Sequence, residues 1–192
     1  MCLCLLQKGD CCKNQKYQHQ PIARLPNTLA PRNPPMATAA QPNTASDDEI
    51  KAHIEAIIAR GFPNSAIYNF LLSDVRIHSA SKGLVIARLT LTNNHVNSRG
   101  GLHGAVSATI VDWAGGMAIA SWDLREKTGV SVDIHVTYLS SARVGDEIEI
   151  EARADKVGGA LAFTKIAISK VVDGVAGALV ASGTHTKYVK QP

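Results

Sequence analysis

The stretch LHGAVSATIVDWAGGMAIASWDLR, residues 102–125, decides the fold. Most of its residues are small or apolar, on nearly every side of a helical wheel. Polar residues that interrupt it include His103, Ser107, Asp112 and Ser121. Because a helix that is apolar all round is buried all round, the sequence predicts a helix enclosed by the rest of the chain. Gly115-Gly116 inside it costs about 1 kcal/mol per glycine relative to alanine, which the close approach of another backbone usually offsets.

The segments on either side of this helix are predicted to be one amphipathic helix and six strands. A capping box, Ser46 to Glu49, starts the amphipathic helix, and Gly61 and Pro63 end it. Two strands precede the buried helix and four follow it, and turn residues separate most of them. The strands are predicted over Leu71–Ala80, Leu84–Thr92, Val130–Tyr138, Glu147–Val157, Ala160–Val172 and Leu179–Val189.

This order of elements predicts an α+β domain in which one sheet curls around one helix. Short turns such as Gly158-Gly159 join neighbouring strands, which makes the sheet mostly antiparallel. A chain of 192 residues suffices for one domain with a substantial core, which we place at residues 46–192. No stretch approaches the ~18 consecutive apolar residues of a transmembrane helix.

Residues 1–45 differ from this domain in composition and are expected to be disordered. They hold all four cysteines and are rich in Pro, Asn and Gln. Residues 1–35 carry five basic residues and one acidic residue, which leaves 15 basic and 15 acidic residues in the rest of the chain. The domain therefore has no net charge with which to attract nucleic acid.

Three specific roles for this tail stay open beside the alternative that it adds nothing to the fold. It could be a mitochondrial targeting segment, a palmitoylated segment or a zinc site with His19, although its cysteine spacing is irregular for zinc. The domain lacks cysteine, and no signal-cleavage site follows a hydrophobic segment. A cytoplasmic location is therefore expected, with mitochondria as the alternative.

Familiar catalytic motifs are missing from residues 46–192. There is no Gly-x-Ser-x-Gly elbow, no Gly-x-x-x-x-Gly-Lys phosphate loop, and no His-Glu-x-x-His or Cys-x-x-Cys metal pattern. A serine hydrolase with that elbow and a Walker-type nucleotide site are therefore not expected. The chemistry must come from residues around the predicted buried helix.

A glycine-rich loop, Asn97–Ala105, leads into that helix. The free backbone N–H groups and the positive dipole end at such a junction can bind an anion or stabilise an oxyanion. Gly104 would let a ligand carbonyl approach the backbone closely. The alternative is a junction without a role. His103 either contacts a ligand or caps the loop, and the capping role is favoured.

Asp112 lies between Val111 and Trp113 in the most apolar helix of the chain. A buried carboxylate is usually paired, protonated or functional. Asp112 is therefore either a general base or a core residue satisfied by a neighbouring hydroxyl. Ser131, on the strand that follows the helix, could hydrogen-bond a water molecule or a carboxylate.

Spacing along the helix adds a constraint. Nine residues separate His103 from Asp112, about 900° of turn and about 13 Å of rise, so the two lie on opposite faces. Asp112 would then serve the helix N-terminus of a second chain. That chain's helix would pack antiparallel along the small residues Ala114, Gly115 and Ala118, which predicts a two-fold dimer with two shared sites.

The motifs around the helix resemble those of hotdog-fold acyl-CoA thioesterases of the PaaI-like type, in particular its eukaryotic branch, thioesterase superfamily member two. The resemblance runs from about residue 65 to 189 and rests on the combination of motifs. The matching residues are Asn97, His103-Gly104, Asp112, Gly129–Asp133, Tyr138, Leu161–Thr164 and Gly183–Lys187.

The resemblance implies a hotdog fold and hydrolysis of fatty acyl-CoA without metal or redox cofactor. It also implies a homotetramer, built as a dimer of dimers, with active sites at the dimer interface. By position, the Gly104 N–H would polarise the thioester carbonyl, and Asn97 with His103 would shape that pocket. Asp112 of the opposite subunit would activate the attacking water, assisted by Ser131. The residues implied to contact CoA are Asp133, Tyr138, Lys156, Val157, Gly158, Gly159, Ala160, Leu161 and Tyr188.

The chain departs from the family pattern in three places. Ala105 replaces the second glycine of the usual His-Gly-Gly, Trp113 follows the acid, and the hairpin Val171–Leu179 is long. Two alternative functions stay open. One is a hydratase or dehydratase, which would need His103 and Asp112 to meet across an interface. The other is a non-catalytic acyl-CoA or acyl-carrier binding protein.

Overall fold

The computed structural model of the chain describes residues 45–190. The predictions for residues 1–44, including disorder, targeting and the cysteine cluster, lie outside the described residues. Within the described part, no helix combines the length and the apolar character needed to cross a membrane. The elements in chain order are α1 (Asp47–Gly61), the 3-10 turn η1 (Phe62–Asn64), α2 (Ala66–Leu72), β1 (Arg76–Ser81), β2 (Leu84–Thr90), the 3-10 turn η2 (Asn93–His95), α3 (Gly104–Asp123), β3 (Val130–Tyr138), β4 (Glu147–Val157), β5 (Leu161–Val172) and β6 (Val175–Tyr188).

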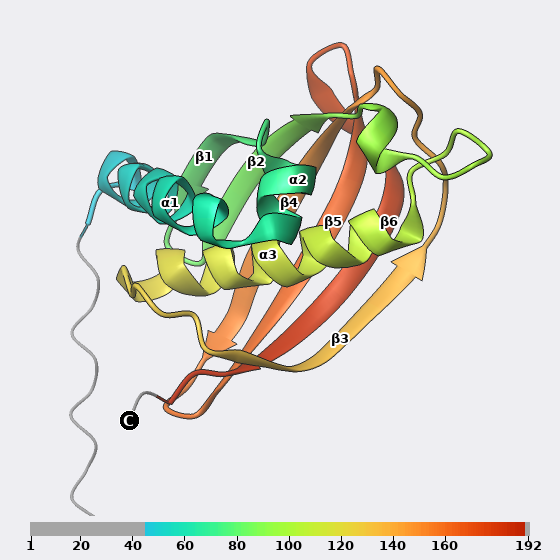
Figure 1. Ribbon diagram of the computed structural model, residues 1–192. Helices are drawn as coiled ribbons and strands as arrows, with labels where there is room; N and C mark the ends of the chain where they lie inside the picture. The colour runs from blue at the N-terminus through green and yellow to red at the C-terminus, as the bar shows by residue number, and fades with distance from the viewer. Residues whose placement is uncertain (1–44, 191–192) are drawn as a thin grey trace, which may run out of the picture. The chain divides into compact units, whose positions relative to one another are not determined.

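The six strands form one antiparallel sheet in the order β1-β2-β4-β5-β6-β3. The sheet curls, and α3 lies along its inner side (Figure 1). α1 and α2 lie towards the β1 edge, whereas β3 forms the opposite edge. The predicted α+β fold, a curled antiparallel sheet around one long helix, is confirmed.

Alternation along the strands determines which residues reach the core. In β4, Ile148, Ile150 and Ala152 are buried, while Glu149 and Glu151 between them lie on the other face. The capping box of α1 also forms as predicted, because the Ser46 hydroxyl accepts the Glu49 N–H and the Glu49 carboxylate accepts the Ser46 N–H. The local signals and the tertiary packing therefore agree over most of the domain.

Small residues let α3 approach the sheet closely. A Cβ atom added to Gly115 would lie 2.8 Å from His185 Nδ1 and 2.9 Å from Thr164 Oγ1, so side chains of β5 and β6, and not another backbone as expected, approach this glycine closely. The same packing corrects another prediction. Ala114, Gly115 and Ala118 are buried within the chain's own core, so this face is not available to the helix of a second chain.

Two strand boundaries were predicted wrongly. Leu71 and Leu72 end α2, and β1 begins only at Arg76. α2 has seven residues and one buried side chain, too few for a helical period to be visible. At the other end, β6 begins at Val175, because Asp173 (φ 52°) and Gly174 (φ 80°) form a tight two-residue turn. The other elements lie within two residues of their predicted bounds.

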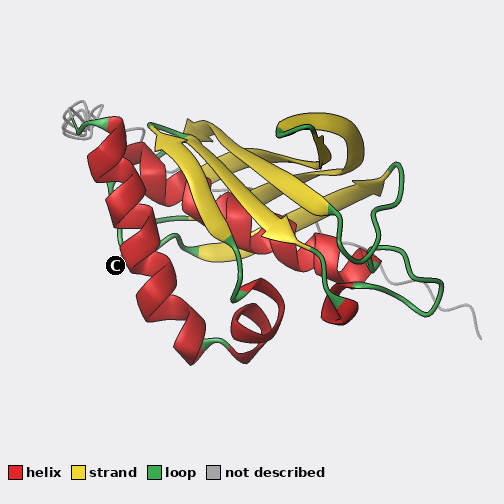
Figure 2. Ribbon diagram, turned by 90° about the horizontal axis from the view of Figure 1, so that it is seen from above, coloured by secondary structure: helices red, strands yellow, loops and turns green. Residues whose placement is uncertain are grey.

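One side of α3 is left uncovered within the single chain. Its C-terminal half, Trp113–Ser121, is buried all round as predicted, but the N-terminal half is not. There a stripe at helical spacing stays partly or fully exposed: Ala105, Ala108, Thr109 and Asp112. Asp112 of this stripe hydrogen-bonds Tyr68 of α2 and Ser131 of β3. Figure 1 shows α3 passing between α2 and β3, and Figure 2 shows from above how α3 runs along the sheet.

The edge strand β3 next to this stripe carries exposed apolar side chains. Val130 is 66% exposed, Val132 59% and Tyr138 58%. Soluble proteins rarely leave an apolar edge strand uncovered, because its free N–H and C=O groups pair readily with another strand. An apolar edge strand and an uncovered side of α3 therefore lie next to each other within the single chain.

Candidate active site

The loop before α3 is organised by Asn97. Its Oδ1 atom accepts the N–H groups of Arg99 at 2.9 Å and Gly101 at 3.3 Å. The Asn97 N–H also donates to the Gly101 carbonyl at 2.8 Å. Asn97 thus fixes the glycine-rich turn that delivers the chain to the helix N-terminus.

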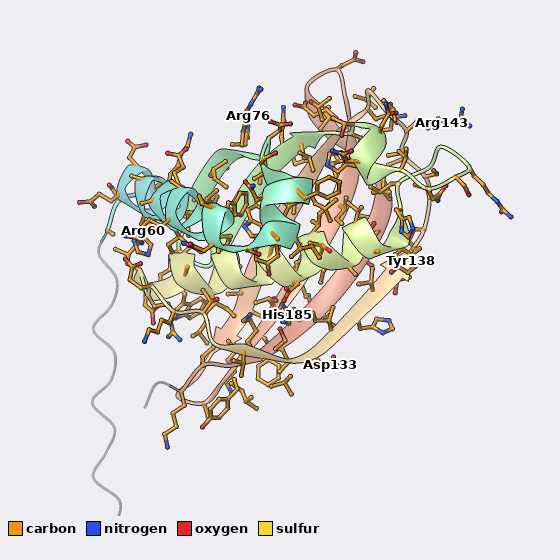
Figure 3. All side chains as sticks on the ribbon, viewed as in Figure 1. Arg60, Arg76, Asp133, Tyr138, Arg143 and His185 are labelled. Carbon is orange, nitrogen blue, oxygen red and sulfur yellow. The ribbon has the colours of Figure 1, made fainter. Side chains whose placement is uncertain are left out.

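The N-terminus of α3 presents a free backbone donor. His103 is the N-cap, and its Nδ1 atom accepts the Ala105 N–H at 3.0 Å, so the predicted capping role is confirmed. The Gly104 N–H has no hydrogen-bond acceptor among residues 45–190. The Tyr138 hydroxyl donates to the Gly104 carbonyl at 3.2 Å, and Figure 3 shows Tyr138 beside the start of the helix. We call Asn97, His103, Gly104 and Tyr138 the glycine end.

Asp112, further along the helix, is held by two hydroxyl groups. The Ser131 hydroxyl donates to Oδ1 at 3.2 Å, and the Tyr68 hydroxyl donates to Oδ2 at 2.6 Å. The hydroxyl partners expected for a carboxylate in this helix are therefore present. The expected burial is wrong, because the Asp112 side chain is 30% exposed on the uncovered stripe. A carboxylate has about four acceptor positions, so this one can accept a further donor such as a water molecule.

His185 extends this group into the core. It is fully buried on β6, beneath the middle of α3 (Figure 3), with Nε2 2.9 Å from Ser131 Oγ and 3.6 Å from Asp112 Oδ1. Burial, and then the positive charge of Lys187, lower the pKa of His185 and favour the neutral ring. Since the Ser131 hydroxyl donates to Asp112, its oxygen is free to accept the Nε2–H of His185. The Nδ1 atom has no partner within the described part of the chain, as suits an unprotonated nitrogen.

Burial also shifts two neighbouring groups. It raises the pKa of Tyr68, and the hydrogen bond to Asp112 adds to that rise, so the phenol remains a donor. It lowers the pKa of Lys187, against the opposing influence of Asp112. We call Tyr68, Asp112, Ser131, His185 and Lys187 the acid cluster.

Three members of the acid cluster were given no role from the sequence. His185 and Lys187 lie within the Gly183–Lys187 motif. They are polar residues at positions of a strand that face the core, and this pattern could have indicated a functional role. Tyr68 gave no signal, since it lies on a short helix that was not predicted.

The residues expected to contact CoA fall at different places. Tyr138 belongs to the glycine end, and Asp133 lies further back along β3 (Figure 3). Tyr188 pairs with both Leu161 and Val130, so it joins the turn between β4 and β5 to the start of β3, next to Ser131. The hairpin residues from Lys156 to Leu161 therefore lie towards the acid cluster rather than the glycine end.

One chain does not bring the two groups together. Gly104 and Asp112 are eight residues apart on α3, about 12 Å along the helix axis. The glycine end offers a free backbone donor without an acid, whereas the carboxylate belongs to the acid cluster. Among residues 45–190, no three His, Cys, Asp or Glu side chains gather as they would around a metal ion.

Comparisons with known proteins connect this geometry to a family. The family model described as "Thioesterase superfamily" matches residues 99–176. Acyl-coenzyme A thioesterase 13 from Homo sapiens is 38% identical over 119 residues, 62% of this chain and 82% of its own length. Among solved structures, thioesterase superfamily member 2 from zebra fish is 33% identical with a TM-score of 0.63, covering 76% of this chain and 99% of its own. The Mus musculus protein of the same name is 30% identical with a TM-score of 0.59, covering 76% and 98%.

Proposed function

The chain belongs to the thioesterase superfamily, and from this premise we propose that it hydrolyses acyl-CoA thioesters to the free acid and CoA. Its membership confirms the resemblance to hotdog-fold thioesterases of the PaaI-like type and to thioesterase superfamily member two. The acyl-CoA substrate is supported by the human relative, which is named for acyl-coenzyme A and is matched over most of its length. The proposed reaction uses neither metal nor redox cofactor.

The proposed chemistry divides between the two groups. The Gly104 N–H, reinforced by the positive end of the α3 dipole, donates to the thioester carbonyl and stabilises the oxyanion. Asn97 and His103 hold the backbone that presents this donor. Asp112 accepts a proton from the attacking water, whose oxygen bonds to the carbonyl carbon, and Ser131 holds the carboxylate in place. The C–S bond then breaks, and the proton returns to the sulfur of CoA.

We propose that the complete site forms between two copies of the chain. The free edge of β3 and the uncovered stripe of α3 lie side by side and support this assembly. Two β3 strands paired antiparallel about their middle would place Ser131 of one chain near the Tyr138 end of the other. The 12 Å between Asp112 and Gly104 of one chain would then be bridged by the second copy, giving two sites per dimer. The implied dimer of dimers would follow from pairing two such units.

The proposed CoA contacts also divide between the glycine end and the acid cluster. The turn Lys156–Leu161 and Tyr188 lie near Ser131, so they would serve the site that contains Asp112 of their own chain. Tyr138 would serve the site that contains Gly104 of its own chain, and Asp133 lies on β3 between these positions. Exposed Lys156 would supply a positive charge for a CoA phosphate.

The observation that carries the proposal is the partly exposed Asp112, held by hydroxyls but open to one further donor. The test incubates the full chain with acyl-CoA esters from acetyl to palmitoyl and with phenylacetyl-CoA, separating CoA from its esters by chromatography. Chromatography avoids thiol reagents, which would react with the chain's four cysteines. Asp112→Asn should lower turnover by about 10²–10⁴-fold while the protein still folds.

The other results are equally informative. Equal turnover by wild type and Asp112→Asn would disprove the role of Asp112. Saturable binding of the esters without CoA release would identify a binding protein. Conversion of an enoyl-CoA without release of thiol would identify a hydratase.

A further inference from the structure

Tyr68 contacts Asp112 directly, yet the proposed reaction assigns it no part. We propose that Tyr68 is a positioning residue, whose hydroxyl holds Oδ2 of Asp112 while Ser131 holds Oδ1. The inference rests on the proposed function of Asp112 as the group that activates water. It makes α2, the short helix before β1, a part of the catalytic apparatus.

The geometry of the two hydrogen bonds carries this inference. Tyr68 donates at 2.6 Å and Ser131 at 3.2 Å, and the two donors reach different oxygens of one carboxylate. Rotation of the carboxylate about its last torsion would break both bonds together. The shorter bond comes from Tyr68, and no other donor reaches Oδ2 from residues 45–190. The orientation of the acid therefore depends most on α2.

The position of Tyr68 is itself fixed by packing. Its ring lies 6.1 Å from that of Phe62, which in turn lies 6.2 Å from the ring of Trp113, the residue after Asp112. Leu72 at the end of α2 is fully buried, and the Leu71 carbonyl lies 2.8 Å from His95 Nε2. α2 is thus attached to the core at both its tyrosine and its C-terminus, so the hydroxyl is presented by a held side chain.

The charges around Asp112 favour this role. The groups facing it are Ser131 on β3, His185 and Lys187 on β6, and Tyr68 on α2. Burial raises the pKa of Tyr68, so its hydroxyl keeps its proton while a carboxylate ionises. A neutral donor to a carboxylate stabilises the ionised form, which is the form that accepts a proton from water. His185 reaches Asp112 through Ser131, so Tyr68 supplies the second, independent donation.

The test is Tyr68→Phe in the full chain, because it removes the hydroxyl and leaves the ring in place. A hydrogen bond to a charged group is worth about 1.5–3 kcal/mol, so kcat should fall about tenfold or more, with KM for the acyl-CoA little changed. A merely structural role would not make this loss depend on the Asp112 carboxylate, so the effect of Tyr68→Phe is also measured in an Asp112→Asn background.

Two controls keep the result interpretable. Phe70→Leu changes an aromatic residue on the same helix that is 61% exposed, and it should leave kcat unchanged. In an Asp112→Asn background, Tyr68→Phe should have little further effect, because the two residues act through one hydrogen bond. Thermal unfolding of each variant shows whether the fold is retained.

Each outcome decides between the two proposals. A Tyr68→Phe variant with wild-type kcat would overturn the role of Tyr68, even if Asp112→Asn is inactive. That role is equally overturned if Tyr68→Phe lowers kcat as much in the Asp112→Asn background as in wild type. If Asp112→Asn is itself fully active, the proposed function of Asp112 fails, and the inference about Tyr68 fails with it.

Discussion

The glycine end and the acid cluster lie on the same helix but are built by different means. The functional group of the glycine end is a backbone group, the free N–H of Gly104. The Asn97 side chain fixes the loop that carries it, and the His103 imidazole caps the helix. The acid cluster is made of side chains from α2, α3, β3 and β6 that hydrogen-bond one another. The first depends on local sequence and the second on the completed fold.

This difference decides how each group tolerates change. A backbone donor survives most side-chain substitutions and is lost only when the N–H itself is removed. A side-chain network loses its geometry when one member is shortened, because a buried polar partner is left unpaired. The glycine end should therefore tolerate most side-chain substitutions, whereas the acid cluster should not.

Among the changes that test this difference between the two groups, the largest effect should come from Gly104→Pro, which removes the proposed carbonyl donor. Proline is well tolerated at the first position of a helix, and His103 (φ −73°, ψ 133°) already has the extended conformation that precedes proline. Loss of one oxyanion donor should lower kcat by about 10²–10³-fold, measured by CoA release. Gly104→Ala is the matched control, because its Cβ meets the Tyr138 ring as proline's does but its N–H is kept. Equal loss in both variants would show that crowding, not the donor, is responsible.

The next effect is the recovery of activity when inactive subunits are mixed. Asp112→Asn and Gly104→Pro each destroy a different half of the proposed site. Random pairing makes half of the dimers mixed, and each mixed dimer has one intact site of two, so about a quarter of wild-type activity should return. The two variants would be co-expressed at equal levels and assayed against each alone. If the mixture is no more active than its parts, each site is contained within one chain.

A smaller effect should follow from charging the edge strand. Val132→Lys places a charge on β3, where the proposed partner strand would have to cover it. We expect the concentration at which dimers dissociate to rise about tenfold or more, measured by analytical ultracentrifugation, with CoA release falling in parallel at low protein concentration. Val175→Lys is the control, since Val175 is 64% exposed against 59% for Val132 but lies at the start of β6. Association unchanged in Val132→Lys would show that β3 does not form the interface.

The same contrast explains what the sequence could predict. The long helix, the curled sheet and the capping role of His103 follow from periodicity, small residues and helix-end chemistry, which are local. Asp112 was recognised because a carboxylate in an apolar helix is conspicuous. Its exposure was not foreseen, because the uncovered stripe depends on where α2 and β3 stop covering α3.

Tyr68 shows why the other contacts of the acid cluster could not be predicted from the sequence. It lies 44 residues before Asp112, on a helix with one buried residue, and no spacing rule connects the two. The predicted packing face of Ala114, Gly115 and Ala118 failed for a related reason. Small residues permit close packing, but they do not say whether the neighbour is another helix or the chain's own sheet.

The smallest predicted effect is a pH dependence of stability that comes from the acid cluster. Burial, with the charge of Lys187, lowers the pKa of His185 in the folded chain, so the unfolded chain binds a proton there at a higher pH than the folded chain does. Stability therefore falls as the pH drops below the ordinary histidine value of about 6.5, by at most about 1.4 kcal/mol per pH unit from this residue. His185→Gln keeps a donor for Ser131 but cannot titrate, so urea unfolding at a series of pH values should show a shallower acid loss than wild type. His135→Gln, which removes an exposed imidazole of β3, is the matched comparison. An acid loss in His185→Gln as steep as in wild type would mean that His185 is not held neutral, and that it does not donate to Ser131 as the arrangement of the cluster requires.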